Sequence, residues 1–276
     1  MDGKIIKIIS NAFTVLSDKE YVCRARGKFR NENIIPLVGD NVIFDKDKKL
    51  ITEIKPRKNS LKRPMIANID QALIVVSVKD PDLDLNLLDK LICIIEYNNI
   101  KPIICLTKID LLDDLNEINN IKNYYEKIGY QVYFNKDEKL KEIFKNKITV
   151  FAGQSGAGKS TLLNILDDSL NLKTGEISKA LGRGRHTTRH VELLPILSGW
   201  CADTPGFSSL DLGMKKEEIK DNFIDFEMYR DLCGYRDCMH IKENDCEIKR
   251  QVGKNILPSR YDNYLKFVNK GEYENK

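Results

Sequence analysis

The sequence predicts an α/β protein with a small β-barrel at its N-terminus and a short helical segment at its C-terminus. In the first 54 residues, short stretches alternate apolar and polar residues, which is typical of a β-barrel. From about residue 70, buried strands alternate with helical stretches, and this alternation favours a parallel sheet. From about residue 215 the pattern is helical and is interrupted by a group of Cys and His residues.

The expected barrel strands are short and lie between turn-like residues. They cover residues 5–9, 12–16, 21–26, 41–44 and 50–54, with turns at Ser17-Asp18, Gly27 and Gly39-Asp40. An OB-like barrel fits this spacing best. Residues 59–68, which contain Pro64 and lie near Pro56, are expected to form a linker.

The central region follows the βα pattern of a parallel sheet. Strands are expected at residues 72–78, 102–106, 130–134 and 148–152, and helices near 85–97 and 115–128. Residues 70 to about 212 therefore form one α/β domain in this interpretation.

The composition is that of a soluble globular protein, with 42% hydrophobic and 31% charged residues. No run of apolar residues approaches the 18 that a membrane span needs, and Met1-Asp2-Gly3-Lys4 lacks the order of a secretory signal. We therefore expect a cytoplasmic protein without a membrane partner.

Basic residues are concentrated near the N-terminus. Residues 1–65 contain 15 Lys or Arg against 8 Asp or Glu, a local balance of +7 within a chain of net charge +4. This excess indicates a polyanionic partner such as a nucleic acid, or else a solvated basic face.

A phosphate-binding loop is the clearest motif. The segment Gly153-Gln154-Ser155-Gly156-Ala157-Gly158-Lys159-Ser160-Thr161 matches G-x-x-x-x-G-K-S/T, with a strand before it and a helix after it. In such a loop the glycines turn backbone N–H groups toward phosphate oxygens. Lys159 is expected to reach the β- and γ-phosphates, and Ser160 to ligate Mg²⁺.

Base recognition is expected at Thr107-Lys108-Ile109-Asp110, which follows the strand at residues 102–106. Asp110 can accept the N1 and N2 hydrogens of guanine, whereas adenine has no donor at position 2. Thr107 stands where this motif more often has Asn, so its link to the rest of the nucleotide site is left open.

Asp203-Thr204-Pro205-Gly206 has the spacing of a switch loop, in which Asp203 holds Mg²⁺ through water and the Gly206 amide senses the γ-phosphate. The glycine- and arginine-rich segment 182–189 contains Thr187 and Thr188, one of which can reach Mg²⁺, and it is alternatively a basic contact surface.

Phe207 cannot orient a water molecule. His186 is therefore the candidate for that catalytic role, with an RNA-facing or structural histidine as the alternative.

Three cysteines and one histidine lie within fourteen residues, at Cys233, Cys238, His240 and Cys246. Tetrahedral zinc requires four ligands of this kind. Because no activated-water base accompanies them, we expect one closed structural zinc ion, with unliganded buried cysteines as the alternative.

Two other functional classes remain open on the residues alone. One is a P-loop ATPase or small-molecule kinase that carries an oligonucleotide-binding barrel, and Asp110 is the residue that distinguishes it. The other is a passive RNA-binding assembly factor, against which the intact Lys159, Ser160 and Asp203 argue.

The order of the motifs is unusual, because Thr107–Asp110 precedes the phosphate loop and Asp203–Gly206 follows it. With the N-terminal barrel, the zinc spacing and the segments at 26–30, 36–40, 68–71 and 182–189, this order resembles the RsgA family of circularly permuted GTPases. The resemblance covers essentially the whole chain.

The resemblance implies a GTPase that acts late in maturation of the bacterial 30S subunit, binds 16S rRNA through its barrel and zinc region, and is stimulated by that subunit. It implies an OB-fold RNA-binding barrel over residues 1–62, a permuted GTPase domain over 66–214 and a zinc-binding helical domain over 215–276. It also implies that the protein binds GTP and GDP with Mg²⁺ and is a monomer. Loss of the γ-phosphate is expected to release the protein from the subunit.

Overall fold

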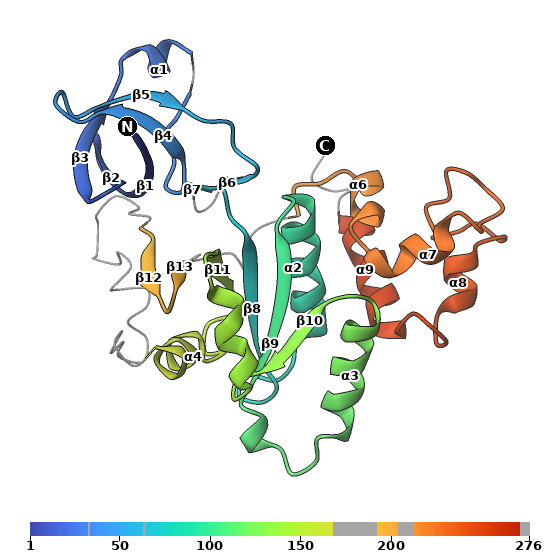
Figure 1. Cartoon of the computed structure of the whole chain (residues 1–276). Helices are drawn as coiled ribbons and strands as arrows, with labels where there is room; N and C mark the ends of the chain where they lie inside the picture. Colours follow the sequence, from blue (N-terminus) through green and yellow to red (C-terminus); the bar gives the residue numbers. More distant parts are fainter. Residues whose placement is uncertain (33, 63–64, 168–191, 204–211, 271–276) are drawn as a thin grey trace. The chain divides into compact units, whose positions relative to one another are not determined.

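The computed structural model describes residues 1–32, 34–62, 65–167, 192–203 and 212–270. The chain, coloured along its sequence in Figure 1, divides into two compact units by its internal contacts. The first consists of Met1–Leu73, Asn135–Ala152 and Gly158–Phe207, and the second of Ile74–Phe134, Gly153–Ala157 and Ser208–Lys276.

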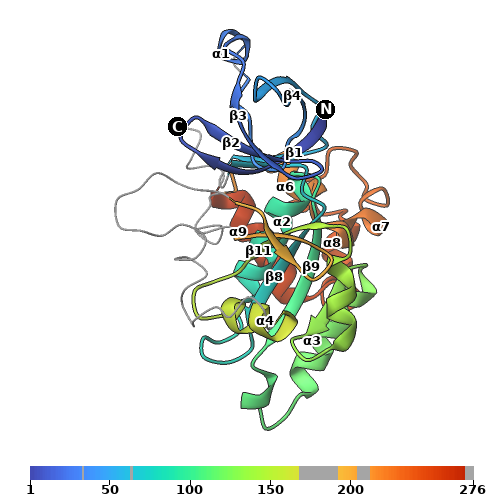
Figure 2. The same cartoon turned by 60° about the vertical axis from the view of Figure 1, so that its left-hand side comes forward.

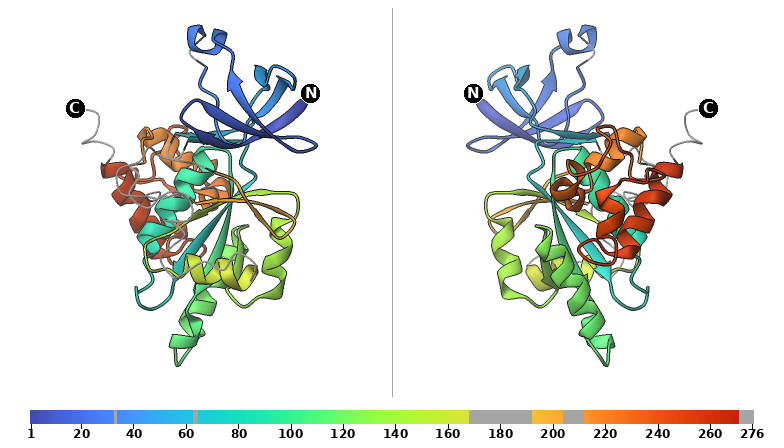
Figure 3. Two further views of the ribbon diagram at one scale, coloured as in Figure 1. Left: turned by 90° about the vertical axis from the view of Figure 1, so that its left-hand side faces the viewer. Right: turned by 90° about the vertical axis from the view of Figure 1, so that its right-hand side faces the viewer.

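A closed five-stranded barrel begins the first unit, as the blue strands in Figures 2 and 3 show. Its strand order is β1-β2-β3-β5-β4, with β1 pairing antiparallel to β4 and β3 parallel to β5. Alternate residues of each strand point inward, so Ile5, Val15, Val42 and Ile51 are fully buried at its centre. The expected OB-like barrel is confirmed. The strands are β1 (Asp2–Ile9), β2 (Ala12–Leu16), β3 (Glu20–Ala25), β4 (Asn41–Asp45) and β5 (Leu50–Ile54), and the short helix α1 (Lys28–Asn31) follows β3.

The expected linker at residues 59–68 contains a hairpin instead. Strands β6 (Ser60–Lys62) and β7 (Met65–Ala67) pair antiparallel, with Ser60 opposite Ala67. The nearby prolines favoured the linker interpretation, but Pro56 lies before both strands, where it disturbs no ladder. Asn68, just after β7, donates to the Gly39 carbonyl at 2.9 Å and so joins the hairpin to the barrel.

A six-stranded sheet forms the α/β region, in the order β10-β9-β8-β11-β13-β12. The Asp70 amide bonds to the Ile148 carbonyl where β8 and β11 begin, and the Val78 amide bonds to the Thr107 carbonyl where β8 and β9 end. These strands therefore run parallel, and their carboxyl ends share one edge of the sheet. The strands are β8 (Gln71–Ser77), β9 (Lys101–Thr107), β10 (Gln131–Phe134), β11 (Ile148–Ala152), β12 (Leu194–Ile196) and β13 (Gly199–Asp203).

Helices connect these strands close to where the sequence predicts them. They are α2 (Leu85–Tyr97), α3 (Asn116–Lys127) and α4 (Lys159–Leu166), with 3-10 helices η1 (Ile109–Leu111) and η2 (Glu138–Phe144). Helix α2 presents one apolar face to the sheet and begins at Asp84, whose carboxylate accepts the Leu87 amide at 2.9 Å.

The C-terminal segment packs through helix α9, and α2 and α9 lie side by side in Figures 1 and 3. Arg260 of α9 is fully buried and donates to Asp89 of α2 at 2.5 Å and to Asp225 at 2.9 Å. Because a charge buried in this way requires partners, the pairs fix α9 on α2. The segment contains α6 (Lys216–Asp221), η5 (Ile224–Phe226), α7 (Glu227–Arg230), α8 (Glu247–Gln251) and α9 (Pro258–Lys270).

Candidate functional site: nucleotide loops and a metal cluster

The phosphate loop leaves strand β11 and enters helix α4. Gly153, Gly156 and Gly158 have φ angles of 130°, 80° and 86°, which L side chains rarely adopt. A Cβ on Gly153 would also overlap the carbonyl oxygen of Val75 in β8. The glycines at these positions are therefore needed for the path of the loop.

Lys159 and Ser160 are the first residues of helix α4, and Thr161 is the third. The first N–H groups of a helix have no partner within the helix and carry the positive end of its dipole, so this position suits a phosphate group. The Leu162 amide already bonds to the Gly158 carbonyl at 2.8 Å, which sets the first turn of α4.

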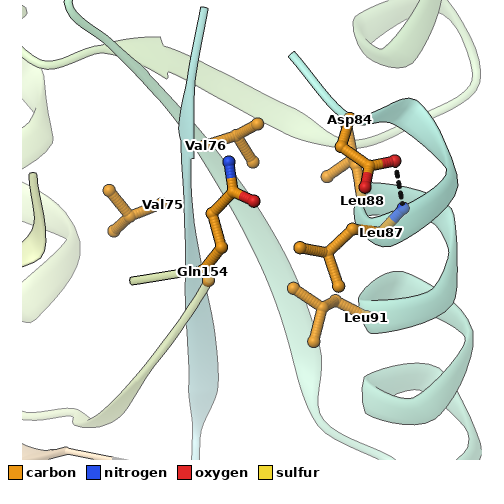
Figure 4. A pocket seen from close by; sticks show the side chains of 8 residues that line it. Val75, Val76, Asp84, Leu87, Leu88, Leu91 and Gln154 are labelled. Carbon is orange, nitrogen blue, oxygen red and sulfur yellow. Dashed lines mark hydrogen bonds between the residues drawn. The ribbon is translucent and has the colours of Figure 1, made fainter. Parts of the chain in front are cut away.

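Gln154 lies between strand β8 and helix α2, where a small pocket opens (Figure 4). The pocket is lined mainly by apolar side chains of these two elements, together with the first two residues of the phosphate loop. Its lining residues are Val75, Val76, Asp84, Leu87, Leu88, Leu91, Gly153 and Gln154.

The segment Thr107–Asp110, which is predicted to read the base, begins at the end of β9 and contacts the phosphate loop directly. The Thr107 hydroxyl is buried, with 3% of the residue exposed, and donates to the Ala157 carbonyl at 2.7 Å. The Val76 carbonyl lies 3.3 Å from the same hydroxyl. Thr107 thus links this segment to the phosphate loop, a connection that the sequence alone left open.

Lys108 has a left-handed backbone, with φ 62°, and its ammonium group bonds to the Asp80 carbonyl. Ile109 and Asp110 lie in the 3-10 helix η1 that starts immediately after it. The motif therefore turns sharply at the edge of the sheet, directly after the strand that carries it.

Asp203 is the last residue of β13, and its backbone lies opposite Phe151 of β11 in parallel register. Since Phe151 comes two residues before Gly153, the ends of these two strands bring Asp203 to the edge where the phosphate loop begins. His186, Thr187, Thr188 and Gly206 lie outside the described residues.

The four predicted metal ligands come together in the C-terminal segment. One ligand atom from each of Cys233, Cys238, His240 and Cys246 lies within 4.8 Å of all the others. Nδ1 of His240 is 3.6 Å from the Cys233 sulfur and 3.5 Å from the Cys246 sulfur. Ligands about 2.3 Å from a tetrahedral zinc ion are about 3.8 Å apart, so this group fits a single metal ion.

Burial shifts the pKa of two of these candidate ligands. It raises the pKa of the Cys238 thiol to about 12 and lowers that of His240 to about 4, because both charged forms lose solvation. A neutral imidazole is ready to ligate, whereas the Cys238 thiol would give up its proton on binding a cation.

Two tyrosines of helix α9 brace this cluster. The Tyr261 hydroxyl donates to the His240 carbonyl at 2.7 Å, and the Tyr264 hydroxyl to the Met239 carbonyl at 2.5 Å. Neither tyrosine was predicted as a functional residue, because aromatic residues three apart on a helix resemble an ordinary core face. The hydroxyl of a buried Tyr requires a hydrogen-bond partner, and this requirement is the property that could have indicated a second role.

The described helices include none long and apolar enough to cross a membrane.

A barrel, a permuted set of nucleotide motifs on a parallel sheet and a Cys/His group define a P-loop nucleotide-binding protein with an appended metal segment. The model of the RsgA GTPase family matches residues 54–213, and that of the RsgA N-terminal domain matches residues 2–51. The chain belongs to the RsgA family of GTPases, so it is a GTP hydrolase, which excludes the kinase, ATPase and passive-factor alternatives.

Several relatives extend over nearly the whole chain. The small ribosomal subunit biogenesis GTPase RsgA of Enterococcus faecalis is 48% identical, over 97% of this chain and 94% of the relative. RsgA 2 of Oceanobacillus iheyensis is 50% identical, over 97% and 96%.

Two crystal structures share the fold. The circularly permuted GTPase YloQ has a TM-score of 0.82 at 39% identity, over 99% of this chain and 95% of that chain. YjeQ from Thermotoga maritima has a TM-score of 0.83 at 32% identity, over 98% of each. The permuted fold expected from the motif order is confirmed.

Proposed function

We propose that this GTPase acts late in the maturation of the small ribosomal subunit. It binds 16S rRNA through its barrel and metal-bearing segment, hydrolyses GTP faster on the 30S subunit, and leaves when the γ-phosphate is lost. The names of the relatives support the small subunit as its site of action. The basic N-terminal region supports contact with a nucleic acid.

The observation that carries the nucleotide part is the hydrogen bond between Thr107 and Ala157. It joins the base-reading and phosphate loops into one site, which suits a ligand with a base at one end and phosphates at the other. Asp110 accepts the guanine N1 and N2 hydrogens, with Thr107, Lys108 and Ile109 shaping its loop. Backbone amides of residues 153–161 hold the phosphates, and Lys159 pairs with their charge.

Mg²⁺ is held by the Ser160 hydroxyl and, through water, by Asp203, with Thr187 or Thr188 as a further ligand in the GTP form. The Mg²⁺ ion supplies neutralisation of phosphate charge. The Gly206 amide senses the γ-phosphate, and His186 orients the attacking water.

The Cys/His group holds one structural zinc ion. Three thiolates and one imidazole are the donor set that zinc favours, and no open coordination position is left for chemistry. We further propose that the protein is a monomer in the cytoplasm, with domains over 1–62, 66–214 and 215–276.

Phosphate release from GTP and from ATP, each with and without purified 30S subunits, tests this function. Turnover of GTP alone, raised manyfold by the subunit, is expected. Indifference to the subunit would remove the proposed ribosomal role while leaving the GTPase activity in place.

Asp110→Asn provides the test of base recognition. The amide NH2 of this variant is a donor. It faces another donor at position 2 of guanine, but an acceptor, the 2-keto oxygen, in xanthine. The nucleotide preference should therefore move from GTP toward xanthosine triphosphate. An unchanged preference would show that another residue reads the base.

A further inference from the structure

Strand β1 contains a β-bulge at Ile6. In its pairing with β2, Ile5 lies opposite Val15 and Lys7 opposite Thr14, so Ile6 is an additional residue. A bulge redirects the backbone groups around it. The Ile6 carbonyl accepts a hydrogen bond from the amide of Leu193 at 2.8 Å, from a segment that is far away in the sequence.

An ion pair accompanies this backbone contact. Lys7 and Glu192 form an antiparallel β-bridge, and their side chains meet at 2.9 Å. The two side chains are 35% and 27% exposed, so solvent screens the pair only in part. Opposite charges directly across a strand pair stabilise its register. We call Ile6, Lys7, Glu192 and Leu193 the β1 tether.

The β1 tether continues into the hairpin that carries Asp203. Leu193 leads directly into β12, in which Leu194 pairs with Cys201 of β13, and β13 ends at Asp203. This hairpin is firmly packed, since Leu193 and Ile196 are 2% and 1% exposed. A Cβ on Gly199, at its turn, would overlap the Phe144 carbonyl oxygen. A packed hairpin moves as a unit, so a shift at Leu193 reaches Asp203.

We propose that the β1 tether transmits RNA binding at the barrel to the nucleotide site. A phosphate backbone bound by the barrel shifts β1, and β1 then sets the position of the β12–β13 hairpin and of Asp203 at the Mg²⁺ site. Lys7 and Glu192 are positioning residues in this scheme. The inference rests on the proposed function, which supplies both the RNA contact and the role of Asp203.

Charge-reversal variants distinguish a loss of this coupling from a general loss of protein stability. The variants are Lys7→Glu, Glu192→Lys and the double reversal, which restores an opposite-charge pair. The readout is the ratio of GTP turnover at saturating 30S subunit to turnover without it. Glu126→Lys is the matched control, because it breaks an ion pair with Lys122 within helix α3, outside the barrel and the metal-bearing segment.

Each single reversal should lower the stimulation ratio at least about threefold, and the double reversal should restore it to near the wild-type value. Glu126→Lys should leave the ratio at saturation unchanged. Single reversals with a normal ratio, or a double reversal that fails to restore it, would overturn the coupling alone. A wild-type protein that the 30S subunit does not stimulate would overturn the proposed function and the coupling together.

Discussion

Removal of the Thr107 hydroxyl should weaken nucleotide binding without altering the fold of β9. Thr107→Val keeps the branched shape that suits a strand and deletes only the donor to Ala157. A hydroxyl has one hydrogen to donate. The 2.7 Å contact to Ala157 is therefore its main bond, and the 3.3 Å contact to Val76 is secondary.

The size of the expected loss of affinity follows from the burial of both hydrogen-bonding groups. Thr107 is 3% exposed and Ala157 is fully buried, so water does not replace the lost donor readily. Leaving a buried carbonyl unpaired costs about 1–3 kcal/mol. If the nucleotide must then order the two loops itself, the Kd for GTP rises by about 5- to 150-fold.

The assay is titration of a fluorescent GTP analogue against wild type, Thr107→Val and Thr107→Ser. The Ser variant retains the hydroxyl and should bind within a few-fold of wild type. Urea unfolding of each variant separates a loss of affinity from a loss of fold. Wild-type affinity in the Val variant would refute the link between the two loops, and so would a Ser variant as weak as the Val variant.

Three further predictions concern the glycine loop, the buried arginine and the metal. Gly153→Ala should abolish GTP binding through backbone strain and overlap with β8, whereas Gly27→Ala, which meets nothing within 4 Å, should bind normally in the same titration. Arg260→Met should lower the free energy of unfolding by about 3–5 kcal/mol in urea, because two carboxylates stay buried without their partner. Zinc chelation, or Cys246→Ser, should make the segment around residues 227–250 sensitive to limited proteolysis, with bound zinc measured in parallel.

Much of the fold follows from local patterns that the sequence displays directly. Period-two alternation located the barrel strands, and the phosphate loop was recognisable because its glycines require conformations with positive φ. The hairpin at residues 60–67 was not predicted, because three-residue strands are too short to show the alternation of apolar and polar residues. The short helix α1 is equally brief and was not expected.

Contacts between distant segments were beyond the reach of such patterns. Thr107 and Ala157 are separated by fifty residues, and Lys7 and Glu192 by 185. In the sequence, Thr107 is an exception to a motif and Lys7 is one of many surface lysines. Their roles depend on which strand ends meet, and that is settled by packing over the whole chain. The site assignments for Asp110, Lys159 and Asp203 remain predictions for mutagenesis.

The permuted order of the motifs is compatible with a single site because strand order, and not chain order, decides which loops are neighbours. Strand β8 lies between β9 and β11, so the predicted base-reading loop after β9 and the predicted phosphate loop after β11 flank its carboxyl end. Gly153 packs against the Val75 carbonyl of β8, and Thr107 reaches Ala157. Parallel strands place all of their following loops at one edge whatever order the chain visits them in. A change of connectivity that preserves these neighbours therefore preserves the contact between the two nucleotide loops.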